Sequence, residues 1–140
     1  MNGRNLTVAL MVFAVLLVGC GPADGPALEG TQWTLVALGG EPPLTGTAPS
    51  AEFSKDQISG SAGCNTYFGA YLVRGGEISI SDVANTEMWC ADPEGVMDQE
   101  QAFLAALRSA ASYRLAGEQL ELLDAAGSVI LVLEPGSATP

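Results

Sequence analysis

The sequence predicts an α+β domain that is β-rich, with a mostly antiparallel sheet and one helix packed on it. Two observations support this fold class. Between residues 28 and 135, short runs rich in β-branched, aromatic and aliphatic residues alternate with turn-forming residues, as expected for short strands. One segment of the same region instead repeats its apolar residues at helical spacing. A helix covering one face of an antiparallel sheet accounts for both patterns.

The strands are predicted from the apolar runs and the turns between them. A run beside Trp33 ends at Gly39-Gly40, and residues 41–50 contain three prolines, which indicates a surface loop. Arg74-Gly75-Gly76 is a strong hairpin signal between two further runs. Strands are therefore expected at 34–38, 51–53, 57–60, 67–73, 77–80, 113–115, 119–123 and 128–133.

The helix is predicted to begin at Asp92 as N-cap, with Pro93 in the first helical position. Its apolar face is formed by Val96, Met97, Phe103, Leu104, Leu107 and Ala111. The carboxylates at its start are Asp92, Glu94, Asp98 and Glu100. We expect them to complement the helix dipole, because they lack the regular ligand ladder of a calcium-binding loop.

The N-terminal residues 1–19 are expected to be a signal peptide. Arg4 precedes an apolar run of 14 residues, Leu6 to Gly19, which is shorter than the roughly 20 residues of a membrane-spanning helix. The run ends in Leu17-Val18-Gly19-Cys20, which resembles the lipobox of bacterial lipoproteins. The alternative is a buried cysteine at the end of an uncleaved anchor helix.

The lipobox resemblance implies cleavage between Gly19 and Cys20 and lipidation of Cys20. Several acyl chains on one residue anchor a protein more firmly than a single chain does. Residues 20–27, rich in glycine and proline, are expected to be a flexible tether, and residues 136–140 a disordered tail. We expect the cell envelope as location. Because Gly21 is not Asp, the periplasmic face of the outer membrane is favoured if the source is Gram-negative, and otherwise the outer face of the cytoplasmic membrane.

The composition of the chain limits the functions expected of the domain at residues 28–135, which lies between tether and tail. The chain has no histidine and a formal net charge of −11. An acidic surface argues against nucleic acid as a partner. The missing histidine excludes Ser-His-Asp and Cys-His catalysis and makes a zinc enzyme improbable. We therefore expect no catalytic residues, no metal and no cofactor.

Several motifs follow one another along this domain. They are Leu28-Glu29-Gly30-Thr31-Gln32-Trp33, Glu52-Phe53, Ile58-Ser59-Gly60, Gly63-Cys64-Asn65-Thr66-Tyr67-Phe68-Gly69 and Thr86-Glu87-Met88-Trp89-Cys90, then a helix with Met97, Glu100 and Leu107, then Tyr113 and a strand at 120–122. In these motifs the chain resembles the META domain, or HslJ-like, family of bacterial envelope proteins and heat-inducible lipoproteins, over about residues 28–134. The resemblance implies an envelope domain linked to stress tolerance, with no established catalytic activity. Many members carry a small residue where this chain has Trp89.

Two cysteines remain once Cys20 is assigned to lipid. In an oxidising compartment, an even number of remaining cysteines favours a disulfide between Cys64 and Cys90. Two free buried thiols are an alternative. A catalytic redox pair is a less favoured alternative, because catalytic dithiols usually lie two residues apart beside groups that lower the thiolate pKa.

Two functions are compatible with these observations. The first is a non-enzymatic, lipid-anchored envelope protein that supports envelope integrity or stress resistance through contacts with another envelope protein. The second is a periplasmic binding module that holds a lipid, a peptide or a small hydrophobic ligand between sheet and helix. An apolar cavity between sheet and helix would favour the second, and a tightly filled interior would count against it.

Overall fold

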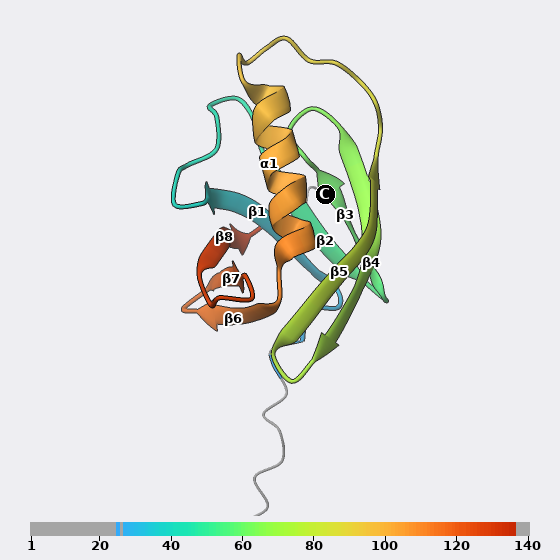
Figure 1. Ribbon diagram of the computed structural model, residues 1–140, viewed down its shortest axis with the longest axis vertical. Helices are drawn as coiled ribbons and strands as arrows, with labels where there is room; N and C mark the ends of the chain where they lie inside the picture. The colour runs from blue at the N-terminus through green and yellow to red at the C-terminus, as the bar shows by residue number, and fades with distance from the viewer. Residues whose placement is uncertain (1–24, 26, 137–140) are drawn as a thin grey trace, which may run out of the picture.

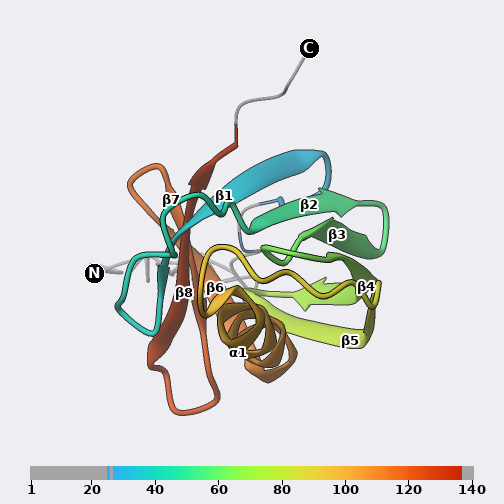
Figure 2. The same cartoon turned by 90° about the horizontal axis from the view of Figure 1, so that it is seen from above.

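The computed structural model describes residue 25 and residues 27–136, which form an eight-stranded antiparallel barrel with one helix packed on it (Figures 1 and 2). The predicted fold class is confirmed. The predicted signal peptide, Cys20 and most of the tail lie outside the described residues. Within the described part, no helix is both long enough and apolar enough to cross a membrane.

Each strand pairs antiparallel with the next along the chain. Every predicted strand is present, and the largest extension is in β5, which was expected to end at residue 80 but continues to Asn85. The strands are β1 (Thr31–Leu38), β2 (Ser50–Ser54), β3 (Gln57–Ser61), β4 (Thr66–Arg74), β5 (Glu77–Asn85), β6 (Ser112–Ala116), β7 (Gln119–Leu123) and β8 (Val129–Pro135).

The barrel is closed by the first and last strands. β1 pairs with β8 from Trp33 opposite Pro135 to Leu38 opposite Leu131. The junction between β5 and β6 is much weaker, with the single pair Glu77 and Ser112. The helix α1 (Val96–Ser109) contacts β5 beside this junction, and Figure 2 shows it next to β5 and β6. The helix thus covers the part of the wall where strand pairing is sparse.

Side chains fill the interior of the barrel. Tyr67 of β4 and Phe103 of α1 are fully buried, and their ring centroids lie 5.7 Å apart in an edge-to-face arrangement. Burial of each large apolar side chain stabilises the fold by roughly 1.5–3 kcal/mol. Other fully buried apolar side chains include Phe53, Ile58, Leu107, Leu120, Leu122, Leu131 and Leu133.

The predicted start of the helix is wrong. The N-cap is Gly95, not Asp92, and its φ of 86° places it in the left-handed region. A residue with that backbone cannot belong to a right-handed helix, so Pro93 cannot be the first helical residue. Instead, the Val96 N–H donates to the Pro93 carbonyl oxygen at 3.1 Å, which closes a turn immediately before the helix.

Candidate functional site

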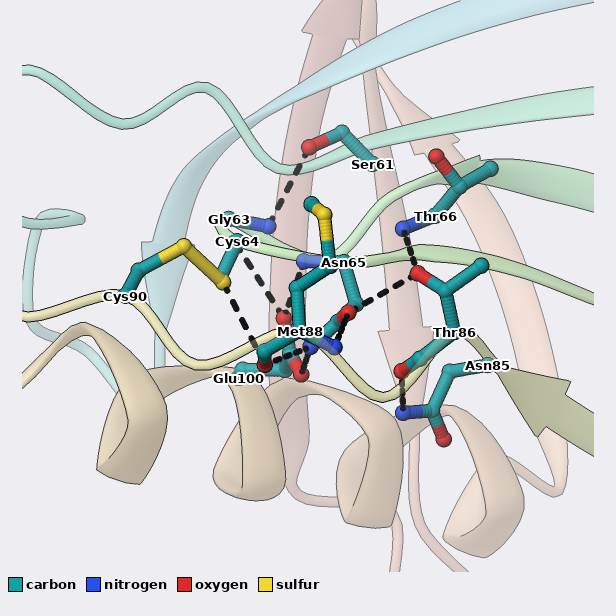
Figure 3. The surroundings of a disulfide bond; sticks show 10 residues. All are labelled: Ser61, Gly63, Cys64, Asn65, Thr66, Asn85, Thr86, Met88, Cys90 and Glu100. Atoms are coloured by element: carbon teal, nitrogen blue, oxygen red, sulfur yellow. Dashed lines mark hydrogen bonds between the residues drawn. A yellow bond between two sulfur atoms is a disulfide. The ribbon is translucent and has the colours of Figure 1, made fainter.

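The turn before β4 is tied to the connection between β5 and α1 by the side chain of Asn65. Asn65 Oδ1 accepts hydrogen bonds from Thr86 Oγ1 at 2.8 Å and from the Met88 N–H at 2.7 Å. Asn65 Nδ2 donates to the Met88 carbonyl oxygen at 3.0 Å and to Glu100 Oε1 at 2.6 Å. All four hydrogen-bonding positions of this amide are therefore used, as Figure 3 shows.

Glu100 of α1 completes this network from the helix. Its Oε2 accepts from the N–H groups of Asn65 at 2.6 Å and of Cys64 at 3.2 Å. Its side chain is only 3% exposed. A carboxylate is an acceptor-only group, which suits a position where three N–H donors converge. The interpretation of Glu100 as a carboxylate complementing the helix dipole is thus wrong, and the first-turn acid is Asp98.

The sequence did contain a signal for Glu100. It lies four residues after Val96 and four before Leu104, both of which are buried. Residues four apart lie on the same helix face, so Glu100 is a charged residue within the apolar stripe. A carboxylate at such a position needs buried donors, because an unsatisfied charge there would be costly.

Cys64 and Cys90 form a disulfide beside this network, with their Cα atoms 5.9 Å apart. Cys64 Sγ also lies 3.7 Å from the Met88 carbonyl oxygen; this is a contact only, since a disulfide sulfur carries no hydrogen. The bond and the Asn65 side chain hold the same connection at adjacent points, Cys90 and Met88 (Figure 3). The residues between β5 and α1 therefore have two independent attachments to the start of β4.

A groove of about 620 Å³ lies between α1 and residues 85–89. We call it the α1 groove, and its lining consists of Asn65, Asn85, Glu87, Met88, Trp89, Met97, Glu100, Gln101, Leu104 and Arg108. Trp89 is 80% exposed and Met88 is 58% exposed. The groove thus combines two exposed, large apolar side chains with a floor fixed by the buried Asn65–Glu100 network.

The polar groups of the α1 groove are mostly occupied within the protein. Both Glu100 oxygens and the Asn65 amide are hydrogen-bonded as described above, and Arg108 Nη2 donates to the Val83 carbonyl oxygen at 3.2 Å. Among the described residues, no cluster of three or more Cys, Asp or Glu side chains could hold a metal ion. The groove therefore presents the exposed side chains of Met88 and Trp89 beside a mostly polar lining.

Tyr67 belongs to the Gly63–Gly69 motif and points into the barrel. Its surroundings indicate a structural role. Its hydroxyl donates to the Ser50 carbonyl oxygen at 2.8 Å. Burial raises the pKa of Tyr67 above its ordinary value, so the phenol stays protonated and keeps this hydrogen bond.

The motif residues that are distant in sequence thus converge at one end of the barrel. Cys64, Asn65, Thr86, Cys90 and Glu100 all contribute to the floor or the attachments of the α1 groove. Cys20, Gly19 and the predicted cleavage site lie outside the described residues. No local pattern in the sequence marks Asn65, Glu100 and the α1 groove as one unit.

Comparison with known proteins gives one family and two similar folds. The META domain family profile matches residues 26–137. The NMR structure of a protein from Burkholderia xenovorans has a similar fold, with 22% sequence identity and a TM-score of 0.66 over 91% of this chain and 99% of that chain. A second NMR structure is 26% identical, with a TM-score of 0.61 over 77% of this chain and 91% of that chain. No curated protein shows significant similarity.

Proposed function

This chain belongs to the META domain family, and on that basis we propose that it is a lipid-anchored, non-enzymatic domain of the bacterial envelope that binds a partner protein through the α1 groove. In this role it supports envelope integrity or stress resistance. The observation that carries the binding part is Trp89, exposed at the edge of a groove whose floor is rigidly held.

The exposure of Trp89 favours a protein partner. Tryptophan is enriched among the residues that dominate protein interfaces, because it buries a large area when a partner covers it. Met88 beside it is flexible and polarizable, and suits contact with varied surfaces. Trp89 lies next to Cys90, so the disulfide restricts how far it can move and lowers the conformational entropy lost on binding.

The membrane part of the proposal rests on the sequence Leu17-Val18-Gly19-Cys20. Replacing Cys20 by Ala removes the only thiol available for lipid attachment before the domain. The Cys20→Ala protein should be recovered in the soluble fraction after cell disruption, whereas the unchanged protein should sediment with membranes. Sedimentation of the variant with membranes would contradict the lipid anchor.

The partner is tested by site-specific photocrosslinking in intact envelopes. A benzophenone amino acid at position 89 should capture one protein in a discrete adduct. The same label at Ser59, on the outer face of β3, is the matched control and should not give that adduct. Identical adducts from both positions would contradict a role for the α1 groove.

A small hydrophobic ligand is the second candidate, because the α1 groove has about 620 Å³ and small-molecule sites occupy roughly 300–1,000 Å³. Because the barrel interior is filled, such a ligand would sit on the surface, where the α1 groove is larger than the hollows of about 280 and 310 Å³ that Leu72 lines. A ligand seated there would change Trp89 fluorescence, so envelope lipid extracts should be titrated against the unchanged protein and Trp89→Ala. A saturable change that is lost in Trp89→Ala would favour the ligand over the protein partner.

A further inference from the structure

The described chain enters the domain at the end of the barrel that carries the β4–β5 turn. A Cβ added to Gly25 would lie 2.6 Å from the Tyr113 hydroxyl oxygen and 2.9 Å from Gly76 Cα, so the backbone there is packed against both residues. Leu28, three residues later, is buried in the core. Figure 1 shows this blue start of the chain beside the β4–β5 turn at the lower end of the molecule.

The number of residues before Gly25 limits where this end can lie. Only four residues separate Cys20 from Gly25, and five Cα-to-Cα steps reach about 18 Å at full extension. If Cys20 is lipidated, as proposed above, the β4–β5 turn must stay within about that distance of the lipid headgroups.

The α1 groove lies at the opposite end of the same strand. β4 has nine residues, which extend about 30 Å, and Asn65 immediately precedes its first residue. The connection between β5 and α1, which carries Trp89, passes over the upper end of the molecule in Figure 1. A short link at one end of β4 therefore directs the groove away from the membrane.

The end near the link also presents an apolar side chain. Leu72 is 53% exposed and lines two surface hollows, one with Gly25 and Tyr113 and the other with Ile78 and Ala110. The charges close to it do not attract anionic lipid, because the carboxylates of Glu29, Asp56 and Glu77 outnumber Arg74 in the same two hollows. Contact with a bilayer here would be apolar.

We infer that the domain stands on the membrane that holds its lipid, with Leu72 and the β4–β5 turn at the headgroup boundary and the α1 groove facing the aqueous side. This inference rests on the proposed lipidation of Cys20. The acyl chains attach the domain to the membrane, and the small number of residues between Cys20 and Gly25 sets the orientation of the domain. Leu72 is the side chain that meets the bilayer.

The orientation is measured with the full-length lipoprotein reconstituted into phosphatidylcholine vesicles that contain a nitroxide-labelled phospholipid. A fluorescent NBD label is attached at Leu72→Cys, or at Glu87→Cys in the α1 groove as the matched control. Quenching by the nitroxide should be severalfold greater at position 72 than at position 87. It should not change between low and high salt, because the contact is apolar.

The possible outcomes distinguish a failure of the proposed orientation from a failure of the lipid anchor. Protein that floats with the vesicles but is quenched equally at both positions, or more strongly at position 87, overturns the orientation and leaves the anchor intact. Quenching at position 72 that disappears at high salt overturns the apolar contact. Wild-type protein that fails to float, as Cys20→Ala should, overturns the anchor and this inference with it.

Discussion

The two ends of β4 are built by different means. At the Thr66 end, Asn65 and Glu100 meet across 35 sequence positions through buried hydrogen bonds, and a disulfide lies beside them. At the Arg74 end, Gly75 and Gly76 turn the chain with positive φ values of 57° and 88°, and Leu72 is exposed. One end is held by a buried side-chain network and a disulfide. At the other end the turn itself is set by local backbone conformation, and the Gly76 carbonyl oxygen also accepts a hydrogen bond from the Tyr113 N–H at 3.0 Å.

This difference shows which end can tolerate change. Removing one group from a buried network leaves its partners unsatisfied, and each such group costs free energy. A substitution in the glycine turn that leaves the backbone hydrogen bonds in place loses at most the conformational preference of the turn. We therefore expect substitutions at the Asn65 end to be far more destabilising than substitutions at the turn, which four variants can test.

The largest effect is expected for Glu100→Ala. It leaves two backbone N–H groups and one Asn65 N–H without their acceptor, and should lower the free energy of unfolding by about 4 kcal/mol, measured by urea denaturation. Glu100→Gln should recover only part of this loss, because its NH₂ group would face an N–H donor. The control is the exposed first-turn residue, Asp98→Ala; an equal loss in both alanine variants would show that Glu100 is not structurally special.

Removal of the disulfide comes next. The Cys64→Ala, Cys90→Ala double variant opens a link between residues 26 positions apart, and should lose about 3 kcal/mol in the chain-entropy model. Because Asn65 still holds Met88, the variant should remain folded. Combining it with Glu100→Ala forms a double-mutant cycle. Strict additivity in that cycle would mean that the disulfide and the network do not support each other.

A smaller effect is expected at the turn from Gly76→Ala. A Cβ at Gly76 would meet no atom within 4 Å, so the cost is only the left-handed backbone, about 1 kcal/mol. Thermal unfolding followed by circular dichroism measures it, with the exposed β5 variant Ser79→Ala as control. A loss as large as that of Glu100→Ala would abolish the proposed contrast between the two ends.

The smallest effect is expected from Leu72→Ser. An exposed side chain contributes little to folding, so the free energy of unfolding in solution should change by less than about 0.5 kcal/mol. Circular dichroism during urea denaturation would detect a larger change. A clear destabilisation would mean that Leu72 packs on the barrel and is not available to a bilayer.

The local end was also the predictable one. The Arg74-Gly75-Gly76 turn and its flanking strands follow from residue types that are neighbours in sequence, so the hairpin was predicted. The Asn65–Glu100 contact depends on how α1 is placed on the barrel, which no local pattern specifies. The helix start was mispredicted for a related reason: Asp92-Pro93 is a good helix-starting pair, but the left-handed Gly95 interrupts it before the helix begins.

The closure of the barrel was likewise beyond local inference. The strands were individually recognisable, but the pairing of β1 with β8 joins segments about a hundred positions apart, from Thr31–Leu38 to Val129–Pro135. Periodicity indicates which faces of a strand are buried. It does not identify the neighbouring strand.

That same pairing sets the order in which the chain can fold. A polypeptide that leaves the ribosome or a translocation channel from its N-terminus presents β1 first and its closing partner β8 last. No partial chain can complete the barrel, and the large sequence separation makes closure a late event. The chain therefore cannot close its barrel until β8, which ends at Pro135, is available to pair with β1.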